Sequence, residues 1–226
     1  MRIDIISIFP DVFTPLHSSI IKRAQDKNVL LLKIWNLRDF TTDRHKKVDD
    51  APYGGGKGMV FKCDPVFRSI KKVKEENPKG WVILTSPQGK VFNHDTAKKI
   101  SGKKGLIIIC GHYEGVDERI KRVVDEEISI GDYVLTGGEI PAMVITDAVT
   151  RLLPGVLPEG APEYESFIND LLDWPCWTRP EKYRSMKVPK VLLSGDHKKI
   201  EQWRLKKAIE ITKAKRPDLY RLYLKK

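Results

Sequence analysis

A few ionisable residues stand next to glycine turns or helix ends, where they could take part in chemistry. The candidates are Glu114, Asp117, Asp132, Arg151 and a carboxylate within residues 157–166. A carboxylate can accept a proton from a reacting group, and an arginine can stabilise negative charge that develops in a transition state. Glu114 lies within the turn Gly111–Gly115, directly after the apolar run Leu106–Cys110. Its structural alternative is a loop-stabilising ion pair with Arg119. For Arg151, spacing alone favours a helical pair with Asp147, four residues earlier.

Two further glycine turns follow close behind the first one. Ile128–Ile130 leads into Gly131, and Tyr133–Leu135 leads into Gly137 and Gly138. A β-rich run that ends in glycine and opens a helix is how an α/β sheet forms a ligand cleft at its strand ends. Glycine lets backbone groups approach a ligand closely, because no Cβ is in the way. We therefore expect these turns to build one pocket.

Alternating strands and helices predict an α/β body, followed by a small helical domain. Strands are expected at 2–9, 29–35, 81–85, 106–110 and 128–130, and helices at about 10–27, 64–76, 93–100, 139–153, 167–172, 198–215 and 218–224. On the helix 139–153, the predicted inward residues are Ile140, Met143, Val144, Ala148 and Leu152. The long polar loop 38–59 combines basic, aromatic and glycine residues, which suits single-stranded nucleic acid as well as a solvated surface.

The positive charge of the chain is unevenly distributed. The net charge of the 226 residues is +11, yet Met1–Asp173 hold 25 basic and 25 acidic residues. Trp174–Lys226 hold 16 Lys and Arg against 5 Asp and Glu, so the entire excess lies in the last quarter. This segregation favours a neutral catalytic body and a basic arm that binds a polyanion. A solvated helical surface is the alternative.

Several classes of protein and site are excluded by what the sequence lacks. No apolar run approaches the ~18 residues of a membrane span, and the strand-like start has no signal-peptide cleavage pattern. The three cysteines, Cys63, Cys110 and Cys176, form no CxxC pair, so neither a disulfide framework nor a zinc site is indicated, and a reducing cytoplasm fits. Neither a phosphate-binding loop nor a GxGxxG turn after a strand is present.

Seven segments, in order along nearly the whole chain, carry a family resemblance. They are DRHKKVDDAPYGGGKGM (43–59), SPQG (86–89), CGHYEGVDER (110–119), SIGDYVLTGGE (129–139), RLLPGVL (151–157), LLDWPCWTRP (171–180) and VLLSGDHKKIEQWRLK (191–206). Together they resemble the bacterial tRNA (guanine-N1)-methyltransferase (TrmD) family of the SPOUT superfamily. The resemblance implies a trefoil-knotted α/β methyltransferase domain at 1–156, a flexible linker at 157–166 and a basic helical tRNA-binding domain at 167–226.

The same resemblance implies a reaction and its participants. Members transfer a methyl group from S-adenosylmethionine to N1 of the guanosine immediately 3′ of the tRNA anticodon. They act as cytoplasmic homodimers with the active site at the interface, and the resemblance also implies Mg²⁺, for which the sequence shows no ligand cluster. Carried over by position, the cofactor pocket comprises Ser86, Pro87, Gly111, Ile130, Gly131, Asp132, Tyr133, Val134, Leu135, Gly137 and Gly138.

Three residues are implied for catalysis. Arg151 is expected to face O6 of the guanine, Glu114 to help hold the base, and Glu165 to be the general base. The family has an aspartate before Ser-Phe at the last position, so Glu165 is a departure, and Trp177 in place of a tyrosine is another. Local rivals for the base are Glu163, Asp170 and Asp173, of which Asp173 is expected to pin the helical domain.

Two other functions remain open from sequence. One is a different SPOUT methyltransferase that acts on another RNA. The other is a non-catalytic RNA-binding dimer, in which basic helices bind RNA and the α/β body only dimerises.

Overall fold

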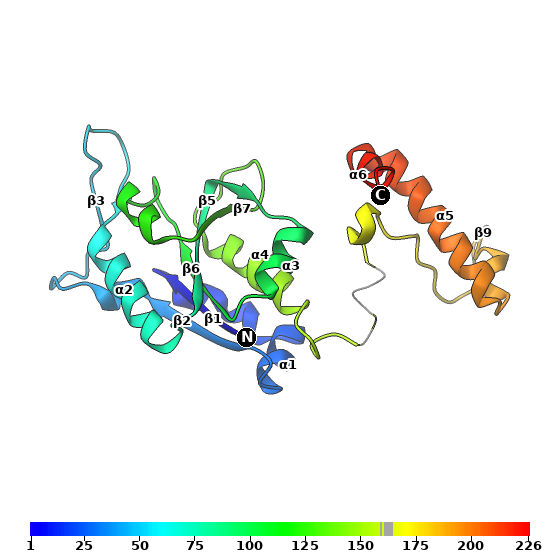
Figure 1. Cartoon of the computed structure of the whole chain (residues 1–226), viewed down its shortest axis with the longest axis horizontal. Helices are drawn as coiled ribbons and strands as arrows, with labels where there is room; N and C mark the ends of the chain where they lie inside the picture. Colours follow the sequence, from blue (N-terminus) through cyan, green and yellow to red (C-terminus); the bar gives the residue numbers. More distant parts are fainter. Residues whose placement is uncertain (159, 161–164) are drawn as a thin grey trace. The chain divides into compact units, whose positions relative to one another are not determined.

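The chain forms two units, Met1–Pro158 and Glu159–Lys226, which are described separately (Figure 1). The computed structural model describes residues 1–158, 160 and 165–226. Part of the predicted linker 157–166, including Glu163, therefore lies outside the described residues. Among the described helices, none is both long and apolar enough to cross a membrane.

The first unit is built on a five-stranded parallel sheet with the order β2-β1-β6-β5-β7. The strands are β1 (Arg2–Ser7), β2 (Leu31–Asn36), β5 (Gly80–Val91), β6 (Gly105–Cys110) and β7 (Glu126–Ser129). All six residues of the central strand β6 are buried, as expected for a parallel strand covered on both faces. The predicted α/β body is thus confirmed.

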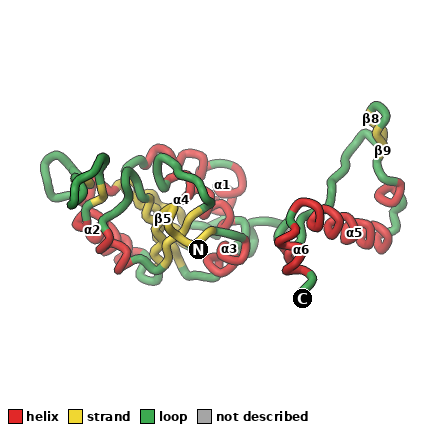
Figure 2. Tube along the Cα trace, turned by 90° about the horizontal axis from the view of Figure 1, so that it is seen from above, coloured by secondary structure: helices red, strands yellow, loops and turns green. Residues whose placement is uncertain are grey.

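Helices cover both faces of this sheet, and each face has its own apolar core (Figure 2). The elements on one face are the 3₁₀ helix η1 (Pro10–His17), α1 (Ser19–Asp26), α3 (His94–Ser101) and α4 (Glu139–Thr150); on the other they are η2 (Leu37–Phe40), α2 (Cys63–Glu76) and η3 (Glu118–Val123). Successive strand residues point to opposite faces, so Leu106 and Ile108 join the first core and Ile107 and Ile109 the second. This alternation makes β6 the centre of both cores.

Several segments differ from what the sequence pattern predicts. The helix expected at 10–27 is broken into η1 and α1, because Ser19, the first residue of α1, has a left-handed φ of 51°. The strand expected at 81–85 is longer, because β5 continues through residues 86–89 to Val91, with a register shift between Thr85 and Lys90. Tyr133–Leu135 form no strand. The loop 38–59 contains η2 and β3 (Asp49–Asp50), which pairs antiparallel with β4 (Val60–Phe61).

The expected inward face of α4 was only partly right: Met143 packs partly buried against the first core, but Ile140 and Val144 do not face inward. Ala142, Ile145 and Val149 are fully buried against the sheet, whereas Ile140 and Val144 are 49% and 41% exposed. Apolar or small side chains occur on every side of this helix, so periodicity alone could not select the face that meets the sheet. An apolar surface is left uncovered on the first unit.

A buried carboxylate in β1 has a structural explanation. The Asp4 side chain accepts hydrogen bonds from the Arg2 guanidinium (2.8 Å), Trp35 Nε1 (2.8 Å) and Asn77 Nδ2 (2.9 Å). A buried charge is tolerated when its acceptor positions are filled in this way. Asp4 therefore ties β1 to β2 and to the end of α2, and it takes no part in the candidate site.

The second unit is dominated by the helices α5 (His197–Lys215) and α6 (Pro217–Tyr223). Shorter elements precede them: the 3₁₀ turns η5 (Ile168–Asp170) and η6 (Lys190–Leu193), and the hairpin of β8 (Lys182–Tyr183) and β9 (Met186–Lys187). The helix expected at 167–172 reduces to η5, because Phe167 and Asn169 adopt left-handed φ values of 77° and 53°. Thr212 connects α5 to the segment that follows η5, since its hydroxyl accepts a hydrogen bond from the Leu172 N–H at 2.8 Å.

Candidate functional site

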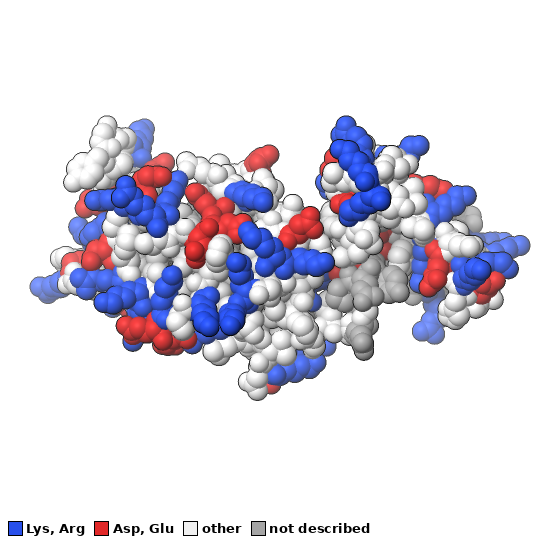
Figure 3. All heavy atoms as spheres, viewed as in Figure 1, with Lys and Arg blue, Asp and Glu red and all other residues white. Residues whose placement is uncertain are grey.

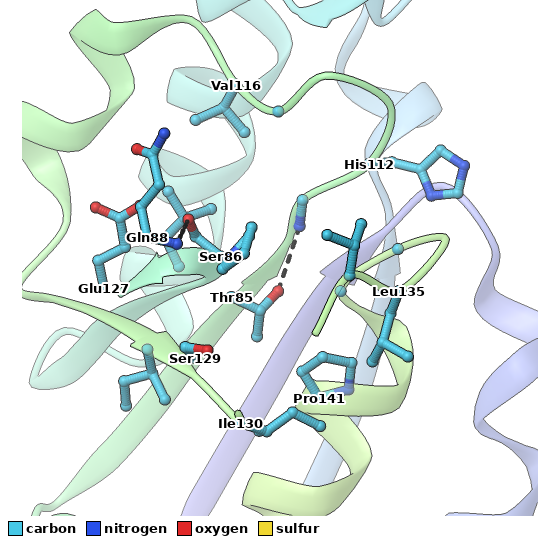
Figure 4. Close-up of a pocket in the computed structure, with 18 of the residues that line it drawn as sticks. Thr85, Ser86, Gln88, His112, Val116, Glu127, Ser129, Ile130, Leu135 and Pro141 are labelled. Atoms are coloured by element: carbon cyan, nitrogen blue, oxygen red, sulfur yellow. Dashed lines mark hydrogen bonds between the residues drawn. The ribbon is translucent and has the colours of Figure 1, made fainter. Parts of the chain in front are cut away.

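A cleft of about 280 Å³ opens at the carboxyl ends of β5, β6 and β7 (Figure 4). Its walls come from the end of β5, the turn after β6 and the segment after β7, which meet because the three strands are parallel neighbours. Figure 4 shows Gln88 and Glu127 together at one end, whereas Ile130, Leu135 and Pro141 gather elsewhere around the cleft. The cleft therefore combines a polar end with an apolar surface.

Gly138 holds the three walls together by a close backbone approach. Its N–H donates to the Gly111 carbonyl at 2.7 Å, and the Gly111 N–H donates to Thr85 Oγ1 at 3.3 Å. A Cβ at Gly138 would collide with Thr85 Oγ1 and with main-chain atoms of Gly111 and Cys110. Only glycine fits this position, so the expectation that the glycine turns form one pocket is confirmed.

Most residues assigned to the cofactor pocket by resemblance line this cleft. They are Ser86, Pro87, Gly111, Ile130, Gly131, Tyr133, Val134, Leu135, Gly137 and Gly138, and Glu114 lines it too. Asp132 is exposed and is not one of the lining residues. Arg151 caps the end of α4 away from the cleft walls, with its N–H donating to Asp147 O at 3.1 Å. Glu165 belongs to the second unit.

The alternative role of Glu114, a loop-stabilising ion pair with Arg119, is wrong. Arg119 instead pairs with Asp117 at 2.7 Å, and the hydrogen bond from that guanidinium holds the pKa of Asp117 well below its usual range. Asp117 also caps η3 by accepting from the Arg119 N–H, so it has a structural role. Glu114 stays at the cleft wall, with its N–H donating to Met59 O at 3.0 Å. That bond brings the end of the loop 38–59 to the cleft.

Comparison with known proteins assigns the chain to a family. The sequence profile described as tRNA (Guanine-1)-methyltransferase TrmD matches residues 1–222. The chain belongs to this family. Curated relatives of the same name, tRNA (guanine-N(1)-)-methyltransferase, include those of Thermotoga maritima and Dictyoglomus turgidum, each 55% identical over 97% of this chain and 90% and 89% of their own lengths. The Geobacter sulfurreducens relative is 52% identical over 97% of this chain and 91% of its own.

Four residues of this TrmD-family cleft were missed by sequence reasoning. Lys121 Nζ lies 2.9 Å from Gln88 Oε1, 3.1 Å from Glu118 Oε2 and 3.6 Å from Glu127 Oε2, and all four residues line the cleft. The hydrogen bond to Glu118 raises the pKa of Lys121. These residues come from β5, η3 and β7, so no spacing along the chain could have brought them together.

The cleft offers an unused polar atom as well as space. Among the described residues, Glu127 Oε1 and His112 Nδ1 are buried without a hydrogen-bond partner. Buried polar atoms are normally paired, so Glu127 Oε1 is available to a ligand, whereas His112 Nδ1 faces Gly137 and Glu139 behind the cleft wall. A polar end, an apolar surface and walls of glycine fit a nucleoside that carries a charged tail. The residues present therefore fit S-adenosylmethionine, the methyl donor implied for the family.

No residues for a metal are brought together in the part of the chain that the structure describes. Over 1–158, 160 and 165–226, no group of three His, Cys, Asp or Glu is placed to hold an ion.

Glu139 supports the cleft from behind. This glutamate begins α4, is only 6% exposed, and its Oε1 accepts a hydrogen bond from Ser7 Oγ at 2.7 Å. Its Oε2 lies 3.8 Å from His112 Nδ1. His112 in turn forms an antiparallel bridge with Gly137, where a Cβ would collide with both Glu139 and His112. Glu139 thus fixes the two glycine turns relative to β1.

Replacing Glu139 by alanine is expected to lower the free energy of unfolding by about 1–3 kcal/mol, because the buried Ser7 hydroxyl loses its acceptor. It should also weaken S-adenosylhomocysteine binding, since His112, which forms the bridge with Gly137, loses its contact with Glu139. Urea unfolding and calorimetry measure the two effects. Ser7→Ala is the matched control, because it removes the same hydrogen bond and leaves the contact with His112. If the loss of stability in the double variant equals the sum of the two single losses, the two side chains are not coupled and the assignment is wrong.

Proposed function

We propose that this chain transfers a methyl group from S-adenosylmethionine to N1 of the guanosine immediately 3′ of the anticodon in tRNA. The observation that carries the proposal is the cleft at the ends of β5, β6 and β7. Ten of the eleven positions that the resemblance assigns to the methyl donor line it, in a chain of the TrmD family. Bound there, the sulfonium of the donor would supply an already activated methyl group.

The chain's own residues would hold the donor and the target base. The turns at Gly111 and Gly137–Gly138 provide main-chain groups at the cleft wall, and Ile130 and Leu135 provide apolar contacts. N1 lies on the Watson–Crick edge of guanine, so the base must leave its stack to react. Glu114, already on the cleft wall, is the residue we assign to holding the extruded base.

Proton removal and charge stabilisation need groups from outside this cleft. N1 carries a proton, for which we propose Glu165 as general base. Negative charge develops on O6 as the proton leaves, and Arg151 is proposed to stabilise it. Arg151 does not line the cleft of its own unit, so it would have to act on a cleft of another subunit.

We also propose a homodimer, because Arg151 does not line the cleft of its own unit. The exposed apolar residues Ile140 and Val144 of α4 supply a surface that a second copy would cover, and Arg151 lies at the end of the same helix. A two-fold interface along α4 would bring Arg151 of each subunit toward its partner. Light scattering is expected to give the mass of a dimer. An active monomer would contradict this arrangement.

The second unit is proposed to bind tRNA. We propose the methyltransferase domain at 1–156, the linker at 157–166 and the tRNA-binding domain at 167–226. The whole excess positive charge lies after Asp173, and Figure 3 shows many lysine and arginine side chains on the visible face of this unit. A polycation of this kind binds nucleic acid by releasing counterions. We further propose the trefoil knot of the SPOUT superfamily for the first unit and a cytoplasmic location, which suits the free thiols of Cys63, Cys110 and Cys176.

The deciding experiment incubates total tRNA with the protein and S-adenosylmethionine and maps the modified nucleotide. 1-Methylguanosine 3′ of the anticodon is the expected product. A methyl group at another position would make the chain a different SPOUT RNA methyltransferase. Calorimetry with S-adenosylhomocysteine separates both enzymes from the non-catalytic RNA-binding alternative, which should give no heat of binding.

A further inference from the structure

The second unit contains its own cleft, of about 400 Å³, formed before and along α5. Three of the five tryptophans of the chain line it, together with two arginines. These residues are Trp174, Trp177, Trp203, Arg179 and Arg204. Trp177 is 47% exposed, so a flat aromatic surface is open to solvent. None of these residues has a role in the methyl-donor cleft of the first unit.

The arrangement of Arg204 indicates a binding surface rather than a packed core. Its guanidinium carbon lies 4.9 Å from the centre of the Trp174 ring, as in a cation–π stack. Its Nε is buried and has no hydrogen-bond partner among the described residues. The cleft thus holds a stacked aromatic–arginine pair with an unused donor.

Basic side chains flank this aromatic cleft. The hairpin β8–β9 begins three residues after Arg179 and carries Lys182, Arg184 and Lys187, with Tyr183 at the end of β8 57% exposed. All of these residues are exposed in the unit that holds the excess positive charge. Aromatic rings beside exposed cations are the combination that binds unpaired nucleotides, because every base has a flat face and every nucleotide has a phosphate.

We propose that this cleft binds an unstacked nucleobase of the tRNA, which stacks on Trp177, while the hairpin β8–β9 contacts the neighbouring phosphates. The proposal rests on tRNA being the substrate and adds where and how the second unit holds it. Charge complementarity favours RNA over a second copy of this chain, since two arginines and one acidic residue, Glu181, line the cleft and the unit around it carries the excess positive charge. The base would be recognised by stacking, so this contact would tolerate different bases.

The test compares three variants of the full chain in tRNA binding at several salt concentrations. Trp177→Ala is expected to weaken tRNA affinity about 5- to 100-fold, the range for one stacked base, without changing the salt dependence. Trp177→Phe keeps an aromatic ring and should retain most of the affinity. Lys182→Ala should weaken binding less and reduce the slope of log affinity against log salt by about one.

Two controls separate this contact from folding and from assembly. Leu205→Ala removes another exposed apolar side chain of α5 that does not line the cleft, and wild-type tRNA affinity is expected. S-adenosylhomocysteine binding shows that the first unit of each variant is intact. Light scattering of Trp177→Ala should give the wild-type mass; a lower mass would mean that a second copy covers the cleft, and would overturn the proposal.

Failure of this proposal can be told from failure of the proposed function. If wild-type protein methylates tRNA and Trp177→Ala binds tRNA as tightly as wild type, the cleft is not a base site, although the enzyme assignment stands. If Trp177→Phe loses as much affinity as Trp177→Ala, stacking is not the interaction, and the proposal is equally wrong. If wild-type protein does not bind tRNA, both proposals fall.

Discussion

Replacing Glu165 by glutamine is expected to lower the turnover of tRNA methylation by about 10²–10⁴-fold, the usual contribution of a general base. Glutamine keeps the size of the side chain and its hydrogen-bonding capacity but cannot take the N1 proton. Binding of S-adenosylmethionine and of tRNA should change little, because Glu165 is proposed to act on the proton and not to hold either substrate. Single-turnover kinetics with saturating protein measure the effect on the chemical step.

Two local rivals for the role of base have structural contacts of their own. Asp170 pairs with Lys226 at 2.6 Å, and Asp173 Oδ1 accepts a hydrogen bond from Trp174 N at 2.7 Å. The Asp173 N–H also donates to Ser166 Oγ at 3.0 Å, so Asp173 stabilises the segment that precedes the helices of this unit. Both rivals are thus engaged in holding the second unit together. Glu163 lies outside the described residues and is tested by mutation.

Three comparison variants make the assignment of Glu165 falsifiable. Glu165→Asp should retain part or most of the activity, because it preserves a carboxylate at the position where the family has aspartate. Glu163→Gln and Asp170→Asn should methylate tRNA at near wild-type rates. If Glu165→Gln is active while either of these two variants is inactive, the base has been misassigned.

Replacing Gly138 by alanine is expected to abolish measurable binding of S-adenosylhomocysteine. The added Cβ would collide with Thr85 Oγ1 and with the main chain of Gly111 and Cys110, and main-chain atoms cannot move aside as the end of a flexible side chain can. The three walls of the cleft must then separate. Forcing extra volume into a packed position typically costs about 1–3 kcal/mol, so the free energy of unfolding should fall as well. Calorimetry and urea unfolding measure the two effects.

Gly102→Ala is the control for Gly138→Ala. Gly102 has an ordinary right-handed backbone, and its nearest neighbour to an added Cβ is Lys99 O at 3.5 Å, an ordinary contact distance. This variant should bind S-adenosylhomocysteine as wild type does. Wild-type binding by Gly138→Ala would show that the walls can separate without loss of the site, contrary to the close packing described.

The sequence by itself determined the parts of this protein that depend on local patterning. Buried strands such as Leu106–Cys110 and helices such as 198–215 follow from short-range periodicity and appear within a few residues of their expected bounds. Glycine turns after strands predicted one cleft, because parallel neighbouring strands place their carboxyl ends together. The resemblance of seven ordered segments identified the family, which the comparison confirms over residues 1–222.

Only the tertiary structure decided the features that depend on residues distant in sequence. Lys121 meets Gln88 and Glu127 because β5, η3 and β7 converge at the cleft. The face of α4 that packs on the sheet could not be chosen from a helix with apolar residues on every side. Glu139 becomes a support of the cleft only through Ser7, 132 positions earlier in the chain. In each case the contact partner is selected by packing across the sheet. The spacing of residues along the chain therefore cannot predict it.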